Sequence, residues 1–164
     1  MKGKERLLTL ATEIEDGLAE LEEIMLEARQ ALTTRRASME EGDTFALRAM
    51  GSILHDFYTA VEDIFQAIAT EVNGSLPRRE DCHKRLLHSM TLDIPQVRPA
   101  VVLPELEVQL DAYRRFRHVF RNVYGHHLEW SRMAGLLAGL EDTYARLVEC
   151  LRTFQKFLRG VAGA

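Results

Sequence analysis

The spacing of the apolar residues constrains the fold most strongly, because they recur at steps of three and four along most of the chain. The first such stretch covers residues 4 to about 32, and others cover residues 44–73, 104–125 and 129–158. An α-helix turns by about 100° per residue, so this spacing gathers the apolar side chains on one helical face. No stretch alternates apolar and polar residues as a β-strand would. The sequence therefore predicts an all-α fold.

Polar segments and prolines separate the predicted helices. The segment TTRRASMEEGD is expected to be a polar connection after the first helix, and Thr44 is expected to cap the second. A shorter helix is predicted over residues 79–90, followed by the extended segment IPQVRPAVV, since its prolines disfavour a helix. The final residues, GVAGA, are expected to form a frayed tail. The predicted fold is an antiparallel bundle of four to five helices, in a single domain over residues 1–164.

The composition is that of a soluble globular protein, with 46% hydrophobic and 28% charged residues. We find no apolar run long enough to cross a membrane and no secretory signal, so we expect a cytoplasmic location. Cys82 and Cys150 lie far apart and lack the spacing of zinc ligands. No disulfide, metal or cofactor is therefore expected.

Charge is distributed unevenly along the chain. Residues 1–75 hold 7 Lys and Arg against 15 Asp and Glu, a net charge of −8, whereas residues 76–164 hold 14 against 10, a net charge of +4. A strongly acidic half argues against non-specific coating of nucleic acid. A local basic site in the second half remains compatible with these counts.

Cationic residues are concentrated in the run YRRFRHVFRNVYGHH, which covers residues 113–127. Within it, Arg121, Asn122 and His126 form the pattern R-N-x-x-x-H. Gly125 is expected to end the helix, so a guanidinium from the last turn and an imidazole just beyond it can converge. A guanidinium suits phosphate oxygens, and an imidazole exchanges protons near neutral pH. The pattern is typical of phosphodiester chemistry.

The arginines of this run are expected to share one face of the helix. Arg114, Arg117 and Arg121 fall within one broad arc, where they could form a phosphate-binding patch. The interleaved aromatic residues are interpreted as core packing rather than as platforms for stacked bases.

A simpler interpretation stays open, in which these cations only complement the negative end of a helix dipole. A similar spacing of arginine and histidine occurs from Arg48 to His55 and from Arg78 to His83, so the pattern alone is weakly specific. Polar residues of the second helix, including Tyr58 and Glu62, could face a cleft or the solvent. His83 is interpreted as a core residue or as part of a cleft wall.

Three segments, together with R-N-x-x-x-H, resemble the HEPN superfamily and within it the HepT-like ribonuclease toxins. They are LHDFYTAVEDIFQAIATEVNG, LPRREDCHKRLLHSM and RPAVVLPELEVQLDAYRRFRHVFRNVYG, and the likeness covers residues 44–130. The resemblance implies a helical homodimer with a metal-independent endoribonuclease site in the cleft between subunits. It implies catalytic roles for Arg121 and His126, and a site position for Asn122.

RNA is the substrate that this resemblance implies, with Arg114, Arg117 and His127 as further RNA-binding candidates. In the mechanism inferred from the residues, His126 removes a proton from a ribose 2′-OH and Arg121 stabilises the charge on the attacked phosphate. A second copy of both residues across a two-fold axis would supply the acid for the leaving group. Because His127 adjoins His126, the motif leaves open which imidazole reacts.

The resemblance also implies a partner, a nucleotidyltransferase antitoxin of the MNT type, which adds AMP to a tyrosine of the toxin. That tyrosine is expected two residues after the histidine, where this sequence has Leu128, so Tyr124 is the alternative candidate. Two other functions stay open: a non-catalytic helical module that binds a nucleotidyltransferase, for which the acidic half offers a surface, and a structural protein without a ligand.

Overall fold

The computed structural model describes residues 2–74, 81–122 and 127–163. The elements in these ranges are the helices α1 (Lys2–Glu40), α2 (Thr44–Ile68), α3 (Cys82–Ser89), α4 (Pro104–Asn122) and α5 (Trp130–Ala162), with a π-helical turn (Ala69–Asn73) continuing α2. Across the described ranges the only β-type pairing is an isolated bridge between Ile94 and Arg98. The predicted all-α fold is confirmed.

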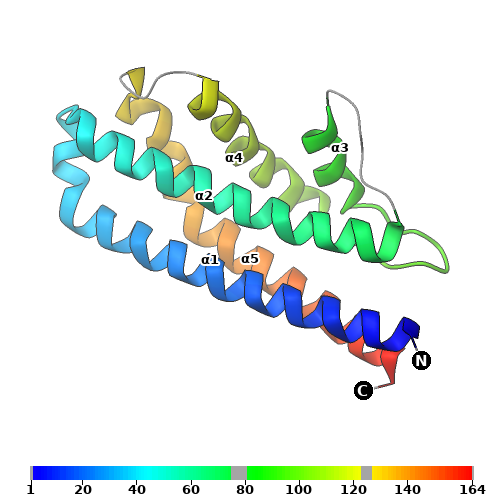
Figure 1. The fold of residues 1–164 in the computed structure, drawn as a ribbon. Helices are drawn as coiled ribbons and strands as arrows, with labels where there is room; N and C mark the ends of the chain where they lie inside the picture. Colours follow the sequence, from blue (N-terminus) through cyan, green and yellow to red (C-terminus); the bar gives the residue numbers. More distant parts are fainter. Residues whose placement is uncertain (1, 75–80, 123–126, 164) are drawn as a thin grey trace.

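Four long helices form the bundle, and each runs antiparallel to the next long helix in sequence (Figure 1). α1 packs against α2 and α5, and α4 completes the ring by packing against the same two helices. The short helix α3 lies outside this ring, on α2 and α4. The inward faces carry the predicted apolar residues, including Leu10, Leu21, Phe57, Phe65 and Phe154, all of which are buried. The arrangement is that of an antiparallel, HEPN-like bundle.

Helix α1 extends further than the sequence predicts. Residues 33–40 were expected to connect two helices, but α1 runs to Glu40 and ends beside Gly42, whose φ of 84° is left-handed. Met39 is fully buried, and Arg36 donates to Glu40 at 2.8 Å, one turn along the helix. Burial of Met39 attaches the polar residues 33–40 to the core as the end of α1. The prediction that they form a connection was therefore wrong.

The cap of α2 lies one residue before the predicted position. Asp43, rather than Thr44, accepts hydrogen bonds from the backbone N–H groups of Phe45 (2.9 Å) and Ala46 (3.2 Å). A carboxylate at this position also complements the positive end of the helix dipole, which favours Asp43 over the hydroxyl of Thr44.

The carboxyl end of the bundle is also more ordered than expected. The residues predicted as a frayed tail continue α5 through Ala162, which is buried.

The connection before α4 is non-helical, as predicted. In it, buried Arg98 donates to the carbonyl oxygens of Ser89 (2.8 Å) and Leu92 (3.0 Å), which holds this segment against the end of α3.

Helices α1 and α2 approach closely where Gly17 faces Ile64. A Cβ atom at position 17 would lie 2.5 Å from Cγ1 of Ile64, a buried residue. We expect Gly17→Ala to destabilise the protein, because two Ile64 atoms within 3 Å place overpacking in the upper part of its range, about 2–3 kcal/mol, above the gain of roughly 1 kcal/mol in helix propensity. Urea denaturation followed by circular dichroism measures the change.

Gly135 of α5 provides the matched control, since a Cβ atom there would meet no heavy atom within 4 Å. Gly135→Ala should stabilise the protein by roughly 0.5–1 kcal/mol. Equal stabilisation by both substitutions would contradict the close contact at Gly17.

None of the helices in the described ranges combines the length and the apolar character needed to cross a membrane.

Candidate active site

A cationic cavity lies between α3 and the second half of α4, with a volume of about 320 Å³. The described residues that line it are all basic or polar: His83, Arg114, Arg117, His118, Arg121 and Asn122. Five of them come from α4, at spacings that place their side chains on one side of the helix. The predicted gathering of Arg114, Arg117 and Arg121 on one face is therefore found in the structure.

Arg121 occupies the last turn of α4, where its side chain is exposed and lines the cavity. It makes no hydrogen bond or ion pair with any residue in the described ranges. Its guanidinium carries five N–H donors in a planar fork, which matches the oxygens of a phosphate group. Of the three arginines, this one can bind an anion without first breaking a contact to a described residue.

Arg117 is held differently, in a buried ion pair with Glu62 of α2. Nη2 of Arg117 donates to Oε2 of Glu62 at 2.8 Å, and the two residues are only 5% and 4% exposed. The guanidinium also lies 4.8 Å from the centre of the Tyr58 ring. Burial, and then the Glu62 charge, raise the pKa of the Tyr58 hydroxyl. These contacts fix Arg117 in place at the base of the cavity.

His83 of α3 binds the same carboxylate. Its Nδ1 atom lies 2.9 Å from each oxygen of Glu62, and its side chain is 46% exposed. Of the two interpretations of His83, core residue or cleft wall, its place in the lining of the cavity agrees with the second. Burial and the neighbouring Glu62 charge also raise the pKa of the Asp63 carboxyl.

Arg114 is held less firmly than Arg117 and more firmly than Arg121. Its Nε donates to Asp111 at 2.7 Å while the side chain still lines the cavity.

Asn122 contacts His118, one turn earlier on α4. Its Nδ2 group donates to the backbone oxygen of His118 at 2.8 Å and approaches the His118 ring at 3.4 Å. Asn122 thus orients the last turn of α4 and the imidazole beside it.

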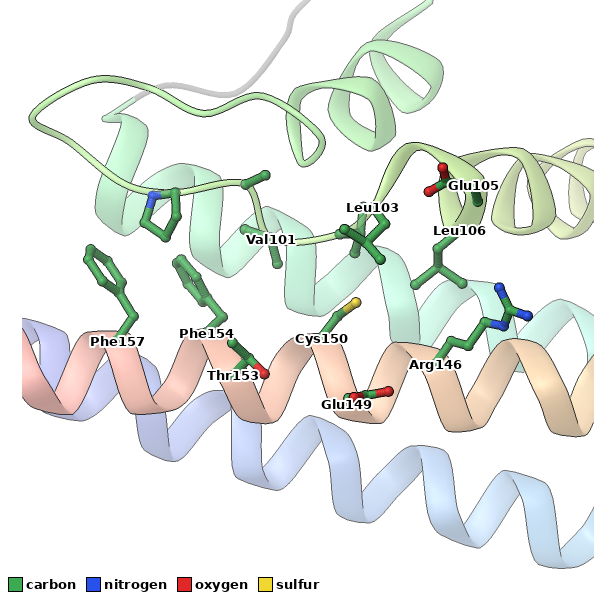
Figure 2. Close-up of a pocket in the computed structure, with 13 residues that line it drawn as sticks. Val101, Leu103, Glu105, Leu106, Arg146, Glu149, Cys150, Thr153, Phe154 and Phe157 are labelled. Atoms are coloured by element: carbon green, nitrogen blue, oxygen red, sulfur yellow. The ribbon is translucent and has the colours of Figure 1, made fainter.

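A larger cavity of about 490 Å³ lies between the segment before α4 and helix α5 (Figure 2). Its walls are mainly apolar, with Val101, Leu106, Phe154 and Phe157 around the thiol of Cys150. Burial raises the pKa of this thiol, which lowers its reactivity as a nucleophile. The smaller, cationic cavity is therefore the better candidate for chemistry.

Comparison with known proteins decides the family. Residues 49–158, more than half of the chain, match the family model described as HepT-like protein. The chain belongs to the HepT-like family. No curated protein and no solved structure matches it. The matched segment of this HepT-like protein includes every described residue that lines the cationic cavity.

Two of the predicted site residues of this HepT-like protein, His126 and Tyr124, lie outside the described residues. His127 is exposed just before α5 and is not among the described residues that line the cavity. Leu128 is half-buried against the core, close to Gly51 of α2. A Cβ atom at Gly51 would lie 2.8 Å from Phe120 and 3.0 Å from Leu128, so α2 contacts the chain on both sides of residues 123–126.

Sequence reasoning did not include Glu62, His83 or His118 among the site residues of the HepT-like protein. One signal was available for Glu62, which follows buried Tyr58 by four residues and so occupies an apolar position of α2. A charged residue at such a position requires a buried partner. No group of three or more His, Cys, Asp or Glu side chains in the described ranges is arranged to hold a metal ion.

Proposed function

We propose that this HepT-like protein is a toxin that acts as a metal-independent endoribonuclease. The cationic cavity at the end of α4 carries the proposal, because Arg121 reaches it with no bond to any other described residue. Arg114 lines the same cavity and adds positive charge for a polyanionic substrate. The protein would act in the cytoplasm on RNA segments whose backbone is exposed.

The proposed reaction begins with the attack of a ribose 2′-oxygen on the adjoining phosphorus. His126 removes the 2′-OH proton, and Arg121 donates hydrogen bonds to the phosphate oxygens as negative charge builds up on them. Asn122 holds the last turn of α4 through its bond to the His118 backbone. The expected products are a 2′,3′-cyclic phosphate and a 5′-hydroxyl.

We propose that the protein works as a homodimer with the catalytic clefts at the subunit interface. Val108 and Val119 are 72% and 43% exposed on α4. They are eleven residues apart and so lie within about 20° of each other around the helix. Exposed Arg115 lies between them on this face, and Arg121 lies about 140–160° away around α4, so the proposed shared cleft rests on membership of the HepT-like family rather than on these valines. Light scattering after size-exclusion chromatography measures the molecular mass.

A nucleotidyltransferase antitoxin of the MNT type is the proposed protein partner. Since Leu128 occupies the position expected for the modified tyrosine, we propose Tyr124 as the site of AMP addition. Mass spectrometry after incubation with the partner and ATP tests this assignment.

Nuclease activity is tested by incubating the purified protein with single-stranded RNA in EDTA. We expect fragments that end in a 2′,3′-cyclic phosphate, and no cleavage of a matched DNA or of an RNA with a 2′-O-methyl group at each nucleotide, because both lack the attacking 2′-OH. His126→Ala should remove the activity, whereas His127→Ala should retain it. Cleavage of the methylated RNA, or full activity of His126→Ala, would contradict the mechanism.

The alternative function is a non-catalytic module that binds a nucleotidyltransferase. One observation favours it: acidic side chains line a groove between α1 and α2, among them Glu13, Asp16 and Glu20. Stable binding of the transferase by a wild-type protein that cleaves no RNA would select this function.

A further inference from the structure

The cationic cavity contains a histidine whose ring is held by a buried carboxylate on another helix. This is His83 of α3, which binds Glu62 of α2 and lines the same cavity as Arg121. We propose that His83 is the general acid that protonates the leaving 5′-oxygen when the RNA chain is cut. The inference rests on the proposed ribonuclease function and adds a catalytic residue to it within one protomer.

The contacts of the ring assign a role to each of its nitrogens. Nδ1 lies 2.9 Å from both Glu62 oxygens, which only accept, and 3.4 Å from Nη2 of Arg117, which already donates to Glu62 at 2.8 Å; the shorter contacts assign the Nδ1 hydrogen to Glu62. Nε2 is then the nitrogen left to exchange a proton on the cavity side. Because the side chain is 46% exposed, a substrate can reach it.

Glu62 is suited to hold this ring because it is itself fixed. It is buried, and Arg117 donates to Oε2 at 2.8 Å while lying over the Tyr58 ring. The position of His83 is therefore determined by α2 and α4 as well as by its own helix. A carboxylate that binds one nitrogen of a histidine sets its tautomer and orientation, and stabilises the positive charge of the imidazolium. Glu62 is thus a positioning residue.

Cleavage of the linkage requires such an acid. The 2′-oxygen forms a bond to phosphorus, its proton passes to a base, and the bond from phosphorus to the 5′-oxygen breaks with its electron pair remaining on that oxygen. The 5′-oxygen then takes the proton from Nε2 of His83, which leaves neutral imidazole and a 5′-hydroxyl. Water restores the proton to His83 after the products leave. All atoms and charges are accounted for without an added cofactor.

Other histidines near the cavity are less suited to this role. His118 also lines it, but its ring contacts the amide of Asn122, which gives no negative charge to hold an imidazolium. His88 has a carboxylate, with Nδ1 3.0 Å from Glu107, but it lines a separate hollow with Lys84 and Arg85. His88 therefore serves as a control: an imidazole on the same helix that contacts a more exposed carboxylate of α4, away from Arg121.

The test uses an RNA in which sulfur replaces the 5′-oxygen at one linkage. A thiolate leaves without a proton, since the pKa of a thiol is only about 8.5. We expect His83→Ala to cut the ordinary linkage about 10²–10⁴-fold more slowly than wild type, and to cut the sulfur-containing linkage at nearly the wild-type rate. Arg121→Ala should be slow on both linkages, and His88→Ala should match wild type on both.

His83→Gln guards against loss of structure, because its amide can still donate to Glu62 but cannot act as an acid. It should show the same loss and the same rescue by sulfur. A variant that remains slow on the sulfur linkage would assign His83 a structural role only, and wild-type rates on ordinary RNA would remove it from the reaction; both outcomes overturn the inference and leave the ribonuclease proposal standing. A wild-type protein inactive on both linkages would overturn both proposals.

Discussion

Replacing Arg121 with alanine is expected to slow RNA cleavage by about 10²–10³-fold, which corresponds to roughly 3 kcal/mol of transition-state stabilisation. The effect should be large because no other described residue binds this guanidinium, so its donors are available to the substrate. Single-turnover kinetics with saturating protein measure the chemical step directly. We expect the loss in the rate constant rather than in RNA affinity, because Arg114 still supplies charge in the cavity.

Arg115 provides the control for this change. It lies on the same helix but binds Asp111 at 3.1 Å and does not line the cavity, and its side chain is 68% exposed. Arg115→Ala should cleave RNA at close to the wild-type rate. An equal loss of activity in Arg121→Ala and Arg115→Ala would mean that cleavage depends on the total positive charge of α4 rather than on hydrogen bonds from the Arg121 guanidinium.

Replacing Arg117 with methionine is expected to cost about 3 kcal/mol of unfolding free energy. Breaking a buried ion pair leaves an uncompensated charge, at a cost of about 3–5 kcal/mol. The lower end applies here because His83 still binds Glu62. Urea denaturation measures the loss, which for a chain of this length corresponds to a decrease in Tm of roughly 6–12 °C.

The double variant Glu62→Gln with Arg117→Met separates the charge from the packing. Glutamine carries no charge to leave unpaired, so the double variant should be more stable than Arg117→Met alone. Arg115→Met, which breaks the exposed pair with Asp111, should change the stability by less than about 1 kcal/mol. A loss at Arg117 no larger than that at Arg115 would show that the buried pair contributes little.

The helices were predictable because their apolar periodicity is strong. In α2, residues such as Leu54, Phe57, Val61 and Phe65 repeat at steps of three and four, and all are buried. The end of α1 lacked this signal, since Met39 is the one buried residue in its last turns, after Ala28. A polar sequence that still forms a helix cannot be told from a connection without knowing what it packs against.

Part of the candidate site was also accessible from the sequence. Helical geometry alone places Arg114, Arg117 and Arg121 on one face, and the structure brings them to one cavity. The partner of Arg117 was not accessible, because Glu62 is 55 residues away on another helix. Local spacing identifies side chains that share a face, whereas contacts between helices depend on how the bundle packs.

The contact at Gly51 positions the end of α4 through a residue that does not itself line the cavity. Phe120 and Leu128 both approach this glycine, so the end of α4 is located by a position on α2 that needs only to lack a side chain. The described residues that line the cavity belong to α3 and α4. In the proposed ribonuclease, variation at Arg114 and His118, which line the cavity without a proposed catalytic role, would therefore alter which nucleotides are accepted while leaving the scaffold intact. A selection for new cleavage specificity would randomise these two positions and keep position 51, the proposed catalytic residues and buried Arg117 unchanged.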